Sequence, residues 1–281
     1  MITIARLTIR EAARKRILWV LLALTIVSVG LTSWGTGALA GLARSEGTTE
    51  LEIRIGVSQI LILAAFMFSF ILAMTAAFLG APAIANDLES GIALSLLARP
   101  IRRSAYVLGR WLGLVAVVAV YAAASGFLEI GAVGFLTGHM PPEPLLAVAF
   151  LAAQAVVLLT TALLLGTRIP AIAAGAVCVV LFGLSWMAGV FAGVARAFDA
   201  DALAAVSDAA RWLFPSDGLW RGVVYGLEPP LVAIVASGSE IGDANPFYAI
   251  APPPPAFIAW SVLWIAGALA LAVWSLERRE V

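Results

Sequence analysis

Charged side chains are scarce in this sequence of 281 residues. They make up 12% of the chain, while 62% of the residues are hydrophobic; an average soluble domain is about 25% charged and about 45–50% apolar. The 17 basic and 17 acidic residues cancel, so no net positive charge attracts nucleic acid. This composition excludes a water-soluble globule and predicts a protein embedded in a membrane.

Side chains that bind metals or perform catalysis are also few. The only cysteine, Cys178, excludes a disulfide framework, and with the only histidine, His139, it cannot form a zinc cluster. No His-Glu-x-x-His motif and no paired carboxylates at helical spacing occur in the apolar stretches. The only lysine, Lys15, follows Arg14 where a Walker A loop needs glycine. We therefore expect no enzyme activity, metal site or cofactor in this chain.

Apolar stretches of about 20 residues are long enough to cross a bilayer, and the sequence contains six of them. The overlong third pattern begins near Tyr106, and its helix either projects from the membrane at its start or breaks around Ser125 and Gly126. We predict an all-α integral membrane protein with six transmembrane helices in one domain, residues 1–281. The stretches run from Ile17 to Gly35, Val57 to Ala81, Trp111 to Leu136, Leu145 to Gly166, Pro170 to Ala195 and Ala256 to Leu276.

Basic residues predict the orientation, because they are enriched in cytoplasmic loops. With the N-terminus inside, the inner segments hold twelve basic residues and the outer segments five. Three of those five lie in one long outer loop, residues 196–255, which also holds seven acidic residues. We expect a multi-pass protein of a bacterial cell membrane, the inner or plasma membrane, with both termini in the cytoplasm.

Residues 1–16 have the pattern of a helix that lies in the inner membrane interface. One helical face is apolar and a ridge beside it is basic, as in helices whose arginines meet anionic headgroups. The alternative is an ordinary basic flank without a separate helix. The apolar positions are Ile2, Ala5, Ile9, Ala12 and Ala13, and the ridge consists of Arg6, Arg10 and Arg14.

Glu129 is the one carboxylate within a predicted span. A charge at the bilayer centre costs about 2.5–3.5 kcal/mol on insertion scales. Counted from Trp111 at about 1.5 Å per residue, Glu129 lies about 27 Å along its helix, near the outer surface. It either faces water there or pairs with Arg196, or it lies on a substrate path or outer gate with Gln154, one of the few polar residues of the spans.

The segment between the second and third spans, residues 82–104, predicts a short amphipathic helix on the cytoplasmic side. Asn86 with Glu89 three residues later resembles a capping box. Leu88, Ile92 and Leu96 then give an apolar face at helical spacing. This helix either covers its own bundle or docks a partner.

The same segment resembles the permease subunits of type-2 ABC transporters. The matching residues are Asn-Asp-Leu-Glu-Ser-Gly (86–91), Leu-Ser-Leu-Leu-Ala-Arg-Pro-Ile-Arg-Arg (94–103) and Tyr-Val-Leu-Gly-Arg-Trp-Leu-Gly (106–113). Ile92 replaces the usual threonine of the family, Arg102 stands where serine is common, and Arg110 replaces a lysine. The six spans and the long last outer loop resemble the family over the whole chain.

The resemblance implies a permease subunit of an ATP-driven ABC exporter, which moves a lipid, hydrophobic drug or similar substrate out of the cytoplasm. Two copies of a cytosolic ABC ATPase would bind the ATP and Mg and dock on a permease dimer surrounded by membrane lipid, either a homodimer or a pair with a related permease. Segment 82–104 would be the coupling helix. Residues 196–255 would form re-entrant helices at an outer gate, or alternatively a covering loop. The implied docking residues are Asp87, Glu89, Ser90, Gly91, Arg99, Arg102, Arg103, Arg10 and Arg14.

Two other classes of function remain open. One is a non-transporting membrane scaffold or assembly factor, for example for maturation of an extracytoplasmic metalloenzyme. The other is an integral membrane enzyme, which the lack of a catalytic constellation disfavours.

Overall fold

The computed structural model describes the whole chain except residues 15, 92–101, 199, 230–244, 250 and 280–281. Within the described part, all regular secondary structure is helical, and six helices are long and apolar enough to cross a membrane. Both findings confirm the predicted fold class.

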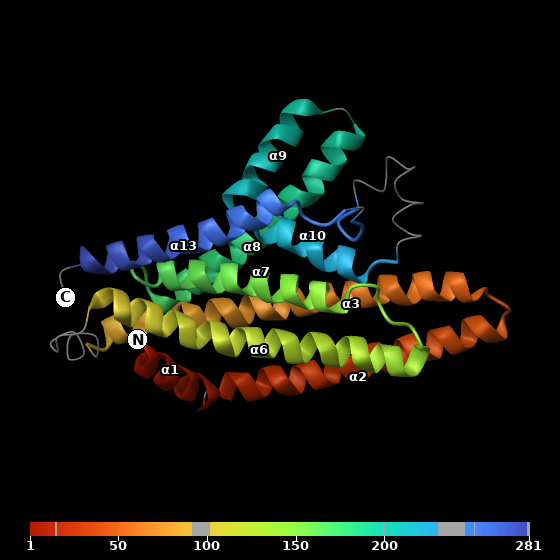
Figure 1. The fold of residues 1–281 in the computed structure, drawn as a ribbon, viewed down its shortest axis with the longest axis horizontal. Coiled ribbons are helices and arrows are strands. Elements are labelled where there is room, and N and C mark those ends of the chain that lie inside the picture. Colours follow the sequence, from red (N-terminus) through yellow and green to blue (C-terminus); the bar gives the residue numbers. More distant parts are fainter. Residues whose placement is uncertain (15, 92–101, 199, 230–244, 250, 280–281) are drawn as a thin grey trace.

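The spanning helices form an elongated bundle, in which α2, α3, α6 and α7 run side by side along the long axis (Figure 1). Helix α6 is continuous over 35 residues, about 52 Å at 1.5 Å per residue, so no break occurs at Ser125 and Gly126. The helices are α2 (Arg16–Ser45), α3 (Glu50–Gly80), α6 (Arg103–Thr137), α7 (Pro144–Leu165), α8 (Ala171–Ala197) and α13 (Pro255–Glu277).

Local sequence explains where several helices begin and end. Thr49 and Glu52 form a capping box at the start of α3, which satisfies two backbone N–H groups that have no partner within the helix. Gly138 ends α6 in the left-handed conformation, with φ of 75°. Pro144 and Pro255 occupy the first positions of α7 and α13, where proline is preorganised for the helix and its missing N–H costs nothing.

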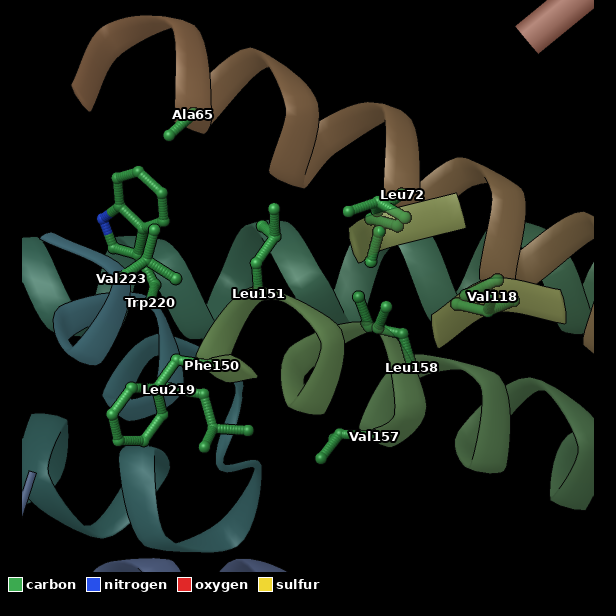
Figure 2. Packing of buried hydrophobic residues seen from close by; sticks show 14 of the residues in the cluster. Ala65, Leu72, Val118, Phe150, Leu151, Val157, Leu158, Leu219, Trp220 and Val223 are labelled. Carbon is green, nitrogen blue, oxygen red and sulfur yellow. The ribbon is translucent and has the colours of Figure 1, made fainter. Parts of the chain in front are cut away.

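The described part of the predicted outer loop contains two short helices, α9 (Asp201–Leu213) and α10 (Ser216–Leu227). Helix α10 enters the bundle and packs against α7, α3 and α8. Figure 2 shows its residues Leu219, Trp220 and Val223 beside Phe150 and Leu151 of α7. Their re-entrant position in the membrane and their role as an outer gate stay predictions.

A row of glycines lets α10 approach its neighbours closely. A Cβ atom added at Gly222 would lie 2.5 Å from the Phe150 ring, and one at Gly226 would lie 2.8 Å from the backbone nitrogen of Ala147. Small residues at four-residue spacing permit such contacts between helices. The four-residue spacing of these glycines is visible in the sequence.

A separate N-terminal helix, α1 (Ile2–Arg14), is present, so the basic-flank alternative is wrong. It crosses the start of α6, and it lies with the start of α6 and the end of α13 at one end of the molecule (Figure 1). The location of α1 in the membrane interface stays a prediction.

Candidate functional site

The segment after the second span does not start a new helix at Asn86. Helix α4 (Pro82–Glu89) follows α3 so directly that Glu50–Glu89 forms one apolar helical stretch, since proline is tolerated at the first helical position. The Ser90 hydroxyl donates a 2.6 Å hydrogen bond to the carbonyl of Asn86, and Gly91 follows with φ of 73°. The predicted capping box is therefore wrong, because Asn86 and Glu89 end a helix. Residues 92–101 of the segment, with Arg99, lie outside the described residues.

Asp87 points into the protein and contacts two side chains of α6. The Tyr106 hydroxyl donates a 2.5 Å hydrogen bond to its Oδ2 atom, and the guanidinium of Arg110 pairs with the same oxygen. The Asp87 side chain is only 13% exposed. A carboxylate taken out of water in this way needs such partners to remain charged.

Arg110 connects three helices. Its guanidinium, 12% exposed, pairs with Asp87 of α4 through one nitrogen and with Glu11 of α1 through the other. Arginine suits this position better than the family's lysine, because its planar fork can serve two carboxylates with fixed geometry. We refer to Glu11, Asp87, Tyr106 and Arg110 as the Arg110 network.

Close backbone packing holds α1 against α6 at Gly109 and Gly113, on either side of Arg110. A Cβ atom added at Gly113 would lie 2.7 Å from the carbonyl oxygen of Ala5, and one at Gly109 would lie 2.7 Å from the Cβ of Ile4. Helix α1 is therefore fixed to α6 by shape and by the charge contact between Arg110 and Glu11.

The other predicted docking residues differ in exposure. Glu89, Ser90, Arg10, Arg14 and Arg102 are exposed, and Gly91 is partly buried. Their role in docking stays a prediction.

Arg103 instead contacts the end of the last span. Its guanidinium donates hydrogen bonds to the carbonyls of Leu276 (2.7 Å), Glu277 (3.0 Å) and Arg279 (3.0 Å). A cation at these carbonyls satisfies backbone groups that lack partners within the helix. The contact fixes α13 to α6. The Arg103 guanidinium is therefore already engaged within the chain.

Of the Arg110 network, only Asp87 was predicted as a site residue from the sequence. Arg110 entered only as a replacement for a family lysine, and Tyr106 only as the start of a span. Glu11 carried a visible signal, since it is the only acidic residue among residues 1–45. An isolated acid within a basic helix indicates a specific partner.

A comparison with known families supplies the identification. The family model described as ABC-2 family transporter protein matches residues 2–281. The chain belongs to the ABC-2 transporter family. No curated protein matches it. Membership confirms the resemblance seen at residues 86–113, and with six apolar helices it makes the chain a multi-pass membrane permease of an ABC transporter.

Gln154 of this ABC-2 permease lies in the bundle interior, away from the Arg110 network. Its Oε1 accepts a 2.6 Å hydrogen bond from Ser69 of α3. Its Nε2 donates 3.2 Å hydrogen bonds to the carbonyl and the hydroxyl of Ser216. The amide therefore joins α7 to α3 and to the start of α10, and its place on a substrate path stays a prediction.

Glu129 is also buried, with 2% of its surface exposed, so the expectation that it faces water is wrong. It lines a cavity of about 20 Å³ between α3, α6, α7 and α10, enough for about one water molecule. Neither carboxylate oxygen makes a hydrogen bond to the described residues. The Thr32 hydroxyl lies beside it without reaching hydrogen-bond geometry. The side chain of Arg196, its predicted partner, lies outside the described residues.

Proposed function

We propose that this chain is the membrane subunit of an ATP-driven exporter of the ABC-2 family. A separate cytosolic ATPase, in two copies, docks on a permease dimer at the end that carries α1 and the end of α4. The ATPase binds the ATP and Mg, and this chain performs no catalysis. Spans rich in alanine, leucine and valine favour a lipid or hydrophobic drug as the exported substrate.

The observation that carries this proposal is the link of three helices at Arg110. The exposed residues Glu89 and Ser90 end α4, which continues α3. Asp87, two residues earlier, is bound to α6 through Arg110 and Tyr106. A push on the end of α4 would therefore move α3 directly and α6 through Arg110.

Such a push would switch the access of the dimer's central cavity. Packed helices respond to a small displacement by shifting together, because a close-packed interior does not deform continuously. Closure of the two ATPase subunits on ATP would supply the displacement. With the docking end in the cytoplasm, both termini would lie there too, and the distribution of basic residues supports this orientation.

Co-purification tests the docking assignment. The tagged chain is extracted from native membranes in mild detergent, bound proteins are identified, and Mg-dependent ATP hydrolysis is assayed. We expect an ATPase with the wild-type chain and about a tenfold loss with Glu89→Arg, because a reversed charge at a docked surface costs roughly 1.4 kcal/mol or more. Glu46→Arg is the matched control, since Glu46 is exposed in the turn between α2 and α3.

Two outcomes contradict the proposal in different ways. Equal recovery of the ATPase with Glu89→Arg and Glu46→Arg would place the docking surface elsewhere. A wild-type chain recovered alone from native membranes, without ATP hydrolysis, would favour the non-transporting scaffold.

A further inference from the structure

An apolar groove lies between α6 and the pair α1 and α2. It has a volume of about 490 Å³, and α1 and α2 lie along the same side of α6 (Figure 1). Trp19 and Tyr121 are the lining side chains with a polar atom, and the Tyr121 hydroxyl is already 2.6 Å from the Thr25 hydroxyl. The lining residues are Ile9, Ala13, Trp19, Leu22, Ala116, Val117, Val120, Tyr121 and Ala124.

The length of the groove limits what can fill it. Along α6 it extends from Ala116 to Ala124, about 12 Å at 1.5 Å per residue. Half of a bilayer core is about 15 Å thick, so the groove is shorter than one leaflet is thick. A membrane-spanning helix of another subunit would need a contact surface of up to about 30 Å. An acyl chain of a single lipid fits the shorter length.

Positive charge lies at one end of the groove. Ile9 and Ala13 of α1 line it, and the exposed ridge Arg6, Arg10 and Arg14 runs beside them on the same helix. Residues three or four positions apart are neighbours on a helix surface. The Arg6 and Ile9 pair and the Arg10 and Ala13 pair therefore place guanidinium groups next to the apolar lining.

We propose that this groove binds one anionic phospholipid from the leaflet that contains α1. An acyl chain lies between α2 and α6, and the phosphate lies against the ridge of Arg6, Arg10 and Arg14. The lipid would complete the contact between α1 and the spanning helices, at the helix that carries Glu11 of the Arg110 network.

Native mass spectrometry of the full chain tests this site without the ATPase, so its result is independent of docking. The purified chain is titrated with phosphatidylglycerol or phosphatidylcholine, and retained lipid is counted. We expect phosphatidylglycerol to be retained more strongly. Val120→Trp, which fills the groove, should lower retention of both lipids about tenfold, equivalent to losing the burial of about two methylene groups.

The control for Val120→Trp is Val262→Trp on α13. Val262 is 62% exposed and Val120 is 69% exposed, but Val262 does not line the groove. It should leave lipid retention unchanged. Ala124→Leu, a smaller change at another lining position, repeats the test if the tryptophan variant folds poorly.

The headgroup contact is tested separately. Arg10→Gln and Arg14→Gln should each lower the preference for phosphatidylglycerol about fivefold, since a basic residue near an anionic surface contributes about 1 kcal/mol. Binding of phosphatidylcholine should not change. Equal loss of both lipids would exclude the proposed phosphate contact.

Unchanged phosphatidylglycerol retention in Val120→Trp and Ala124→Leu would overturn the proposal. The proposal would also be overturned if either variant changed from dimer to monomer while its lipid retention stayed intact. The groove would then be filled by a second copy of the chain.

Discussion

Two buried carboxylates of this permease have opposite surroundings. Asp87 contacts Arg110 and Tyr106, whereas neither oxygen of Glu129 makes a hydrogen bond to the described residues. Asp87 lies at the end of the bundle that carries α1, and Glu129 lies among apolar side chains of four helices. A paired buried charge can hold helices together, while an unpaired carboxyl lowers the stability of the fold.

The two carboxyl side chains have different roles in the fold. The Oδ2 atom of Asp87 is bound within the chain and fixes the relative position of α4 and α6. The Glu129 oxygens make no such bond, and the cavity beside them has room for about one water molecule. Intramembrane carboxyls of this kind are candidates for function, and a substrate path through Glu129 therefore stays a prediction of interest.

The largest loss of stability is expected when the ion pair between Asp87 and Arg110 is broken. Arg110→Ala should destabilise the chain by about 3–5 kcal/mol, because it leaves a buried carboxylate without its cation. This corresponds to a fall in the unfolding temperature of about 10 °C in detergent. Arg102→Ala, at an exposed arginine before α6, should change stability by no more than about 0.5 kcal/mol.

A double variant isolates the pairing itself. Asp87→Asn combined with Arg110→Gln should lose less stability than the two single variants together, because neither charge remains buried alone. Strict additivity of the two losses would show that the residues act independently, and the Arg110 network would then not link α4 to α6.

Replacement of Glu129 should change the unfolding temperature in the opposite direction. Glu129→Leu is expected to raise the unfolding temperature by a few degrees, since it removes a buried carboxyl without hydrogen bonds, worth about 1–3 kcal/mol. Gln154→Leu is the control, because it removes bonds to Ser69 and Ser216 and should destabilise. If both variants destabilise, Glu129 has a bound partner in the purified protein.

The features of this architecture that the sequence predicts are those set by the pattern of residues close together along the chain. Six spans follow from length and hydropathy alone. The ends of α3 and α6 lie within one residue of the predicted ends at Ala81 and Leu136, whereas α3 begins seven residues and α6 eight residues before the predicted starts. The N-terminal helix follows from its apolar face and arginine ridge. These properties depend on neighbours within a few residues along the chain.

The site depends on contacts between distant segments, which a single sequence does not specify. The orientation of Asp87 is set by the continuity of α3 with α4 and by the position of Arg110, 23 residues later. The capping-box pattern at Asn86 and Glu89 favoured a helix start, but the apolar run before it extends the helix of the second span. Local capping preference is worth about 1 kcal/mol, which packing of α4 against α8 and α7 overrides.

The last prediction concerns a third buried carboxyl, which lies outside the spans and is intermediate between the other two. Glu228 accepts a 2.8 Å hydrogen bond from the backbone N–H of Ala249, and its second oxygen has no partner among the described residues. Burial raises the pKa of Glu228 to about 7, against the effect of that hydrogen bond. The folded chain therefore holds a proton that the unfolded chain releases at about pH 4.5.

Because the folded pKa is raised, the stabilising contribution of Glu228 is complete below the unfolded value and is lost as pH rises through about 7. The unfolding temperature should fall over this range, and Glu228→Gln should reduce the fall. His139 provides an internal contrast, since burial, followed by the charge of Arg54, lowers its pKa, so its contribution is lost on acidification. An identical pH profile for the wild type and Glu228→Gln would show that Glu228 is ionised in the fold, and would place it with Asp87 as a satisfied carboxylate.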